Sequence, residues 1–477
     1  MALIGEACVS ALASNNTNAI QLLFGHDVKN TIPQSSLRIA CREGLKGTAR
    51  LLVENEVSVS GDDNELAEAA VDMGDLGVLK YLKEKGLKVD RVQLVQAVRK
   101  GDEKRVSELL KKETDPNDKN QPLLHVAARH DKPKLIPILI KAGAEPEMLD
   151  VHGQTAINTA ISRGHADFAK ELINETNAGC IVKNNKDEFA LHEAARRGVA
   201  DIVDLLLEKD SEARTKSLKH LVLPNKDGMK PLLLAAEHGH PKAVEKLLAA
   251  KTSSLYDMWS RHPTESSPLL LAAENGHEEV VRVLCEHSVP MKNFSDSNGT
   301  TPLMAASKNR KGYNCVKLLL DEEGIDVNAT DSQGNTALFY AIKKSRGSIT
   351  ELLLERGCRT TMRDDGPVVL VQAAEQGHKD IVNFLLDKGD STETAASNGR
   401  TALSAAASSG HKDIVEMLVV YRADVRSRDQ EGNTPLMLAV QREYEGVAKL
   451  LLKHGADIDD IKKDNSILSK KLRDRHK

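Results

Sequence analysis

The chain of 477 residues is poor in aromatic side chains and has no long apolar run. Aromatic residues make up 3% of it, with one tryptophan, so few rings are available to stack on nucleic-acid bases. Its 66 basic and 70 acidic residues give a formal net charge of −4, which provides no overall attraction to phosphate backbones. These deficits argue against a nucleic-acid partner. No stretch approaches the roughly 18 apolar residues that a membrane span needs.

The cysteines are few and widely separated. None of the six stands in the close pairs that zinc sites and redox dithiols use, so we expect reduced thiols that pack as small apolar side chains. The first residues, Met1 to Glu6, lack the basic flank of a secretory signal. The sequence therefore predicts a protein of the cytoplasm, and also of the nucleus.

One short phrase recurs ten times between residues 122 and 450, most clearly as Thr301-Pro302-Leu303-Met304 and Thr434-Pro435-Leu436-Met437. The phrases begin at positions 122, 155, 189, 230, 267, 301, 336, 368, 401 and 434, so successive phrases lie 32 to 41 residues apart. No linker rich in Pro, Gly or Ser interrupts them. Such a period is typical of a solenoid, in which one supersecondary unit is stacked many times.

Residues 429–461 show what one repeat contains. Asp429 and Gly432 favour a tight turn, which we call the finger. Thr434 can cap a short first helix that has Pro435 at its first position. An amphipathic second helix follows and ends at Gly455. The apolar faces of such a pair need their neighbours, so no repeat should fold alone.

The full phrase, Asp-x-x-Gly-x-Thr-Pro-Leu-His-x-Ala-Ala-x-x-Gly-His with an apolar second helix and Gly-Ala-Asp, resembles the ankyrin repeat. Gly-His occurs at 164–165, 239–240, 276–277, 377–378 and 410–411, and Gly-Ala-Asp at 455–457. The resemblance covers residues 118–461, about ten repeats, and implies an all-α solenoid of helix-turn-helix units with short β-hairpin fingers. It also implies that the finger tips and first helices bind partner proteins.

Both ends depart from this pattern. In residues 1–117 the apolar anchors Ala11-Leu12, Ala40-Cys41, Ala69-Ala70 and Ala97-Val98 are 29, 29 and 28 residues apart. We expect about four divergent ankyrin-like helix pairs with shortened fingers there. Residues 462–477 resemble half of another repeat, which is either a C-terminal cap or the point where a longer protein is cut.

The sequence lacks the common catalytic and phosphate-binding motifs, and its histidines are too dispersed to form a metal site. The sequence has no phosphate-binding Gly-x-x-x-x-Gly-Lys loop, no Gly-x-Ser-x-Gly elbow and no His-Glu-x-x-His. Most of its 16 histidines stand at fixed positions of the repeat, such as His125, His192 and the Gly-His pairs, too far apart along a stack to share one metal ion. We interpret them as structural hydrogen-bonding groups between repeats. We expect no metal site, no cofactor and no catalysis.

The positions that the repeat leaves free follow each Ala-Ala pair, at the exposed end of the first helix. In ankyrin-like stacks these positions face a concave groove. They are basic over three repeats, acidic over two, basic over two more and then nearly neutral, which predicts a partner with acidic, basic and acidic blocks in matching order. The alternative is that they serve only solubility. The candidate groove residues are Arg129, His130, Arg163, Arg196, Arg197, Glu237, His238, Glu274, Asn275, Lys308, Lys343, Lys344, Glu375 and Arg442.

Two further features stand outside the repeat. An enlarged finger before Ser267 carries Tyr256 and Trp259, which either anchor a partner or fold back over the adjoining leucine layer; we favour the second interpretation. The segment ending Asp326-Val327-Asn328 resembles the finger sequence that asparaginyl hydroxylases modify in ankyrin repeats, which makes Asn328 a candidate hydroxylation site.

Together these observations predict a monomeric, non-enzymatic scaffold or adaptor that binds one or more proteins through the groove and finger tips. The alternative is the cytoplasmic regulatory arm of a larger enzyme or channel. An open reading frame that continues past Lys477 would favour this alternative.

Overall fold

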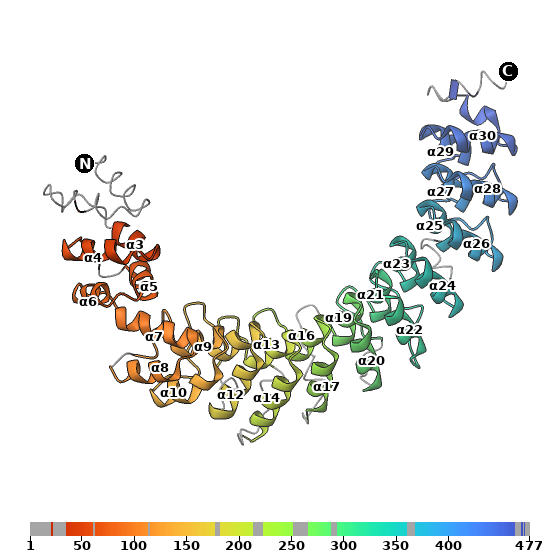
Figure 1. Ribbon diagram of the computed structural model, residues 1–477. Helices are drawn as coiled ribbons and strands as arrows, with labels where there is room; N and C mark the ends of the chain where they lie inside the picture. The colour runs from red at the N-terminus through yellow and green to blue at the C-terminus, as the bar shows by residue number, and fades with distance from the viewer. Residues whose placement is uncertain are drawn as a thin grey trace. The chain divides into compact units, whose positions relative to one another are not determined.

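The repeated phrases fold into paired antiparallel helices (Figure 1). The computed structural model describes residues 35–60, 63–112, 115–176, 182–212, 223–250, 266–287, 293–359 and 368–462, together with residues 21, 469, 470 and 472. The chain divides into two units, Met1–Ala190 and Leu191–Lys477. None of the helices in the described ranges combines the length and the apolar character that crossing a bilayer requires.

The first unit contains two rows of helices, and each pair contributes one helix to each row. In the first row each helix packs on the next: α3 (Ser35–Arg42), α5 (Asn64–Met73), α7 (Val89–Lys100), α9 (Leu123–Arg129) and α11 (Ala156–Ser162). The second row contains α4 (Lys46–Glu54), α6 (Leu76–Glu84), α8 (Glu103–Leu110), α10 (Ile136–Lys141), which the 3₁₀ turn η2 (Pro133–Leu135) precedes, and α12 (Ala166–Thr176).

The second unit repeats the same arrangement. Its first row contains α13 (Ala190–Arg197), α16 (Pro231–Glu237), α19 (Pro268–Asn275), α21 (Pro302–Lys308), α23 (Ala337–Lys343), α25 (Val369–Gln376), α27 (Ala402–Ser409) and α29 (Pro435–Gln441). Its second row contains α14 (Ala200–Glu212), α17 (Pro241–Ala249), α20 (Glu278–Glu286), α22 (Tyr313–Asp321), α24 (Gly347–Glu355), α26 (Lys379–Asp387), α28 (Lys412–Val420) and α30 (Glu445–Lys453), followed by the 3₁₀ turn η3 (Ile458–Ile461).

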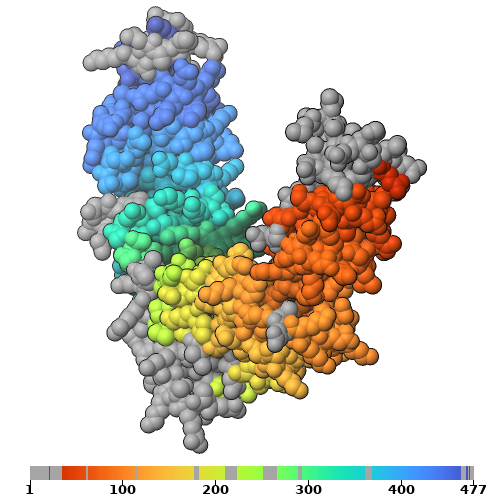
Figure 2. Space-filling view, turned by 90° about the vertical axis from the view of Figure 1, so that its left-hand side faces the viewer, coloured from red at the N-terminus to blue at the C-terminus, as the bar shows by residue number. Residues whose placement is uncertain are grey.

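Within each unit the main contacts join helices of one pair or of neighbouring pairs. Figure 2 shows this for residues 368–453, whose blue layers touch in sequence order. The Ala-Ala pairs lie at these junctions: Ala235, Ala236, Ala373 and Ala374 are fully buried between neighbouring first helices. Side chains this small let the helices approach closely, so the core is shared between repeats. The predicted solenoid is confirmed.

The predicted helix pairs of the N-terminal region are present where the chain is described. They are α3 with α4, α5 with α6, and α7 with α8. Their connections are short: only residues 85–88 join α6 to α7, whereas residues 322–336 join α22 to α23. The predicted pair before Ser35 lies outside the described residues, as does most of the predicted cap at 462–477.

The fingers are tight turns built around one side-chain oxygen. Asp331 Oδ1 accepts hydrogen bonds from the backbone N–H groups of Gln333 and Asn335, both at 2.9 Å. Asp429 does the same with Glu431 and Asn433, as its place in the sequence predicted. Burial alone would raise the pKa of Asp429, but these bonds lower it. No described residue forms a β-strand, so the fingers in the described ranges are turns rather than extended hairpins.

The first helices begin where the sequence predicted. The side-chain oxygen of each capping Thr or Ser accepts a hydrogen bond from the N–H three residues later, at 3.1 to 3.4 Å, which satisfies one of the free donors at the helix start. The capping residues are Thr155, Ser267, Thr301, Thr336, Thr401 and Thr434.

The Gly-His histidines join each repeat to the one before it. In every case a ring nitrogen meets a backbone carbonyl oxygen at the end of the preceding first helix, at 2.7 to 3.0 Å, which satisfies an acceptor that the helix itself leaves free. This confirms that these histidines are structural. The pairs are His165 with Ala128, His240 with Arg196, His277 with Glu237, His378 with Ile342, and His411 with Glu375.

Other residues take this role where histidine is missing. Asn309 donates its amide to the carbonyl of Glu274, and Arg346 donates to that of Lys308. In the N-terminal region Asp75 and Asp102 follow the helix-ending glycine instead, and each carboxylate caps its own second helix. We call the bond to the preceding helix the inter-repeat bond.

Where glycine ends the first helix, the donor side chain of the next repeat packs against it; Asp131 and Ser345 take the same left-handed conformation in the repeats that lack this glycine. Gly239 has a φ of +76°, and a Cβ placed there would lie 2.4 Å from Nδ1 of His277. Gly357 has nearly the same φ, +79°, but a Cβ there would meet nothing within 4 Å. The two glycines therefore share one backbone constraint, and only Gly239 has a steric one.

We expect Gly239→Ala to destabilise the protein more than Gly357→Ala. Both substitutions force alanine into the left-handed region, at about 1–2 kcal/mol. Gly239→Ala also displaces the His277 ring and should cost about a further 1–3 kcal/mol. Urea titrations followed by circular dichroism measure both. In a His277→Ala background the two substitutions should become similar, and a difference that persists there would show that the ring is not the cause.

Buried histidines should make stability depend on pH. Burial lowers the pKa of His125 and of His240, although Nε2 of each ring bonds a backbone carbonyl, which opposes the shift. Protonation of His125 would also place an N–H on its buried Nδ1, which has no hydrogen-bond partner. The unfolded chain therefore binds more protons below about pH 6.5, where an ordinary histidine titrates.

We expect this part of the stability to be fully present above about pH 6.5 and to be lost as the pH falls below it. Urea midpoints between pH 7.5 and 5.5 test this. The double variant His125→Gln and His240→Asn keeps an amide donor, as Asn309 does, and cannot titrate. Its midpoint should vary less with pH, and an unchanged pH profile would contradict the assignment.

Candidate protein-interaction surface

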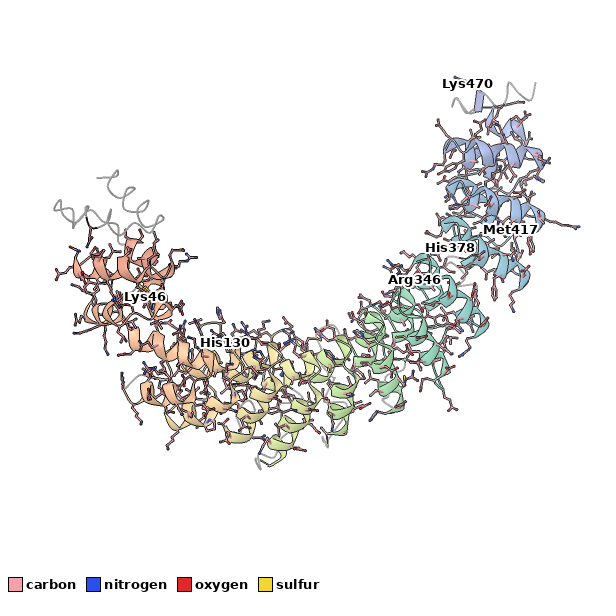
Figure 3. All side chains as sticks on the ribbon, viewed as in Figure 1. Lys46, His130, Arg346, His378, Met417 and Lys470 are labelled. Carbon is pink, nitrogen blue, oxygen red and sulfur yellow. The ribbon has the colours of Figure 1, made fainter. Side chains whose placement is uncertain are left out.

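The candidate groove residues lie on the last turn or at the C-cap of the first helices. Figure 3 shows His130 on the edge formed by the first helices. Arg129, Arg196, Glu237 and Lys308 are partly exposed, and the other candidates are exposed. The exposure follows from the packing: a buried alanine stands two or three residues before each position, and the helix ends at or close to that position. Whether partners contact these residues stays a prediction.

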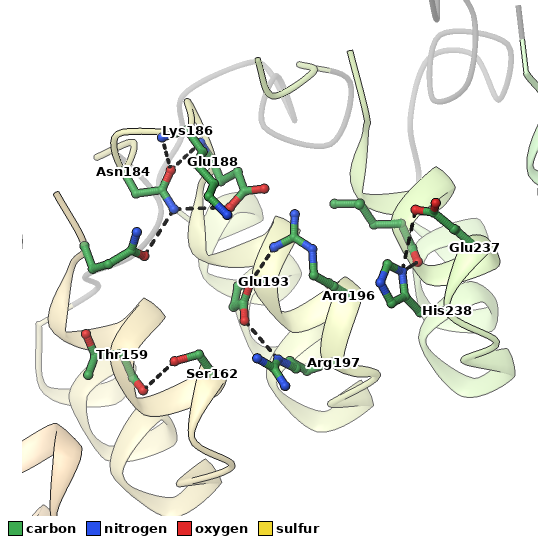
Figure 4. A network of polar contacts seen from close by, with 12 residues as sticks. Thr159, Ser162, Asn184, Lys186, Glu188, Glu193, Arg196, Arg197, Glu237 and His238 are labelled. Carbon is green, nitrogen blue, oxygen red and sulfur yellow. Dashed lines mark hydrogen bonds and ion pairs between the residues drawn. The ribbon is translucent and has the colours of Figure 1, made fainter. Parts of the chain in front are cut away.

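The structure brings a carboxylate between two of the predicted basic residues. Glu193 lies one turn before Arg196 and Arg197 on α13 and pairs with both, at 3.0 Å from its Oε1 to Nε of Arg197 (Figure 4). Glu193 is 9% exposed. One acidic group therefore offsets part of the double charge. The i, i+3 and i+4 spacing is the sequence signal that could have identified it.

A carboxylate from a finger also offsets the charge of Arg129. Asp150, in the finger of the next repeat, lies 3.3 Å from Nη2 of Arg129 and is nearly buried. Its other oxygen accepts the backbone N–H groups that shape the finger. The sequence predicted the turn but not this ion pair, because the two residues belong to different repeats.

In the second basic part of the candidate groove, which contains Lys308, Lys343 and Lys344, two lysines lie over aromatic rings. Nζ of Lys308 lies 3.9 Å from the centre of the Tyr340 ring on the next first helix, and Nζ of Lys343 lies 5.5 Å from that of Phe339. Burial lowers the pKa of Lys308, while neighbouring carboxylates, Asp331 first, oppose that shift. Sequence reasoning missed Tyr340, because the same position of the phrase holds varied side chains, such as Leu234, Gln372 and Leu438, in other repeats.

Tyr340 also ties its helix to its own finger. Its hydroxyl donates to the carboxylate of Asp331. Burial and this acceptor raise the pKa of Tyr340 to about 12. The phenol therefore stays neutral, and its ring remains a fixed support for the Lys308 ammonium.

The acidic region combines Glu237, His238 and Glu274. Glu237 lies 3.7 Å from Nδ1 of His238, whose ring stacks on that of His240 with 6.5 Å between centres. Glu274 is exposed. The carbonyls of Glu237 and Glu274 accept inter-repeat bonds, so the backbone of both is held while their carboxylates remain accessible.

The remaining candidates fall in different places. Glu375 and Arg442 are exposed, on α25 and at the C-cap of α29. The amide oxygen of Asn328 accepts the backbone N–H of Arg359 at 2.8 Å, which links two successive loops. Hydroxylation of Asn328 stays a prediction. Tyr256 and Trp259 lie outside the described residues.

The described thiols are free and buried. Burial raises the pKa of Cys41 and of Cys358 to about 12, and that of Cys315 to about 11; nearby carboxylates add to the shift at Cys41 and Cys315. Thiols of this kind remain protonated at neutral pH and react slowly. Among the described residues, no three His, Cys, Asp or Glu side chains gather as a metal site.

The comparisons agree with the architecture. A family profile described as "Ankyrin repeats (3 copies)" matches residues 94–184, 177–255, 232–331, 314–364 and 370–462. The chain belongs to the ankyrin-repeat family, whose members generally mediate protein–protein interaction. The match begins within α7, so the helix pairs before it are not covered.

Three curated relatives illustrate where such repeats occur. The chain is 32% identical over 135 residues to the mouse B-cell lymphoma 3 protein homolog, covering 28% of this chain and 29% of that protein. It is 31% identical over 261 residues to the Caenorhabditis elegans ankyrin repeat and KH domain-containing protein mask-1, covering 52% and 8%. It is 25% identical over 342 residues to the Arabidopsis thaliana E3 ubiquitin-protein ligase KEG, covering 69% and 19%. The chain thus spans less than a third of each of these relatives.

We expect Cys41, Cys315 and Cys358 to resist alkylation in the folded protein, because their thiols are buried and protonated. Treatment with iodoacetamide at pH 8, followed by peptide mass spectrometry, measures this. The same reaction in concentrated urea is the control and should label all three. Fast labelling of any of them without urea would show that its site opens readily.

Proposed function

We propose that this chain is a non-enzymatic scaffold or adaptor that binds proteins through the exposed ends of its first helices. The observation that carries the proposal is that these helix ends combine exposed side chains with a fixed backbone. The candidate side chains are accessible to solvent, whereas the backbone that bears them is held by buried alanines and by inter-repeat bonds. A surface ordered before binding loses little conformational entropy when a partner docks.

Charge supports selectivity on this surface. In the second unit, Glu237 and Glu274 lie on adjacent first helices, and Lys308, Lys343 and Lys344 follow on the next two. Such alternation favours partners with complementary charge and disfavours those that place like charges opposite. The proposed mechanism is many modest contacts along a fixed surface, which add because they are made simultaneously.

A second candidate is that the chain regulates an enzyme or channel as part of a larger protein. The relative named as an E3 ubiquitin-protein ligase favours it, because the matched repeats make up 19% of that protein. In this case the same surface would bind a substrate or an adjoining domain. Both candidates assign protein binding to the first-helix ends.

The decisive experiment reverses charge on one row of helices at a time. The test variant carries Arg196→Glu, Arg197→Glu, Lys343→Glu and Lys344→Glu. The control variant carries Lys242→Glu, Lys317→Glu, Lys379→Glu and Lys412→Glu, which change the net charge equally on exposed positions of the second row. Affinity capture from a native lysate with quantitative mass spectrometry compares both with the unaltered chain.

We expect the test variant to lose its main partners, with an affinity at least about tenfold lower for each, because the new carboxylates face the partner's acidic blocks and the former ion pairs are lost. The control should keep them. Identical partner sets for the test variant and the unaltered chain would refute the proposal, provided that circular dichroism shows both to be folded.

A further inference from the structure

We propose that the ends of α7, α9 and α11 in the first unit bind an extended acidic peptide whose carboxylates recur at every third residue. This inference rests on the proposed function and deepens it by naming one site and the chemistry of its partner. The site, which we call the basic cluster, consists of Arg99, Arg129, His130, Lys132 and Arg163.

The fold brings these five residues together from three repeats. Helix α9 packs between α7 and α11. Arg99 lies in the last turn of α7, Arg129 ends α9, and Arg163 is the C-cap of α11. His130 is the C-cap of α9, at the middle of the row. Sequence reasoning selected Arg129, His130 and Arg163 but not Arg99 or Lys132.

Lys132 joins the cluster because a glycine gives it room. Its side chain runs over Gly101, which ends α7, and a Cβ at Gly101 would lie 2.9 Å from Cδ of Lys132. The backbone N–H of Lys132 is held by the carbonyl of Ala127. The stem is therefore fixed between two repeats, and its ammonium group lies near the ends of α7 and α9.

Besides burial, the four cationic side chains of the basic cluster all lower the pKa of His130. Burial lowers the pKa of His130, and the charges of Arg99, Arg163, Lys132 and Arg129 lower it further. His130 nevertheless remains exposed, so an anion from solvent can reach the centre of this positive field.

Part of the positive charge has no counterion. Arg99 pairs with Glu68 at 3.5 Å and Arg129 with Asp150 at 3.3 Å. Within the described part of the chain, no carboxylate lies within ion-pairing distance of Lys132 or Arg163, and exposed Asp131, next to His130, pairs with none of the cluster. Two cations on either side of His130 are thus available to a ligand.

The spacing of the helices determines what kind of anion fits. Packed helices lie about 8–10 Å apart. A peptide in the extended polyproline II conformation advances about 3.1 Å per residue with three residues per turn, so every third side chain points to the same face, about 9 Å from the last. One cationic position per first helix therefore matches one carboxylate per three residues. Helices α7, α9 and α11 carry no Phe, Tyr or Trp on which bases could stack, which favours a peptide over single-stranded nucleic acid.

Fluorescence anisotropy with the whole chain tests the spacing. The probe is a labelled Gly/Ser peptide with Asp at positions 1, 4 and 7, and the comparison peptide has the same composition with the three Asp residues adjacent. We expect the spaced peptide to bind at least about fivefold more tightly. Equal affinities would overturn the inference, since unspecific charge attraction would then explain binding. Stronger binding of an oligothymidylate than of the spaced peptide would also overturn it.

The site itself is tested with two pairs of substitutions. Lys132→Gln with Arg163→Gln should weaken binding of the spaced peptide at least about tenfold. Lys46→Gln with Lys80→Gln removes the same charge from exposed positions on the second row and should change it less than twofold. Equal losses of affinity in both variants would show that the peptide does not bind specifically at the basic cluster, and would overturn the inference.

A titration of His130 by NMR gives an independent readout. A bound carboxylate should raise the pKa of His130 relative to the free protein, because it offsets the surrounding positive charge. An unchanged pKa at saturating spaced peptide would overturn the inference. If the spaced peptide fails to bind while lysate partners still depend on Lys343 and Lys344, this inference fails and the proposed function stands.

Discussion

The inter-repeat hydrogen bond is the contact on which the rest of the structure depends. A helix leaves its last carbonyl groups without partners, and in this chain the next repeat supplies a donor for one of them: His240 for Arg196, and Asn309 for Glu274. His240 is the N-cap of its second helix and Asn309 lies in the turn between its two helices, so one bond fixes the end of a first helix against the next repeat. Repetition of this bond along the second unit sets the alignment of neighbouring repeats there.

The same bond explains why the candidate surface lies at the helix ends. The donor ring occupies the space beside the helix-ending glycine, as His277 does beside Gly239, so the chain must turn there. The residues just before that glycine have their carbonyls fixed and their side chains in solvent. The N-terminal pairs have Asp75 and Asp102 at the donor position, each capping its own helix, and their fingers are short. These repeats are therefore joined differently.

Charge on the surface is decided by neighbours as much as by composition. Glu193 neutralises part of a double arginine, Asp150 pairs with Arg129 from the next finger, and Tyr340 supports Lys308. A reading of two positions per repeat finds the candidates but not their partners, which come from an adjacent turn or repeat. Lys132 shows the converse, since it joins the basic cluster only because Gly101 leaves room for its stem.

The sequence alone determined the repeat, the two helices and the capping residues, because each depends on side chains within a few residues of the backbone that they serve. Thr434 and Asp429 are examples: their partners are at most four residues away. The structural role of the histidines followed from their fixed place in the repeat, although the carbonyls that they bond lie 36 to 44 residues away. Only the tertiary structure decided which charges are offset and which remain available. Ion pairs and cation–π contacts between repeats depend on distances of a few ångströms between residues about 20 to 30 apart, and spacing along the chain does not contain that information.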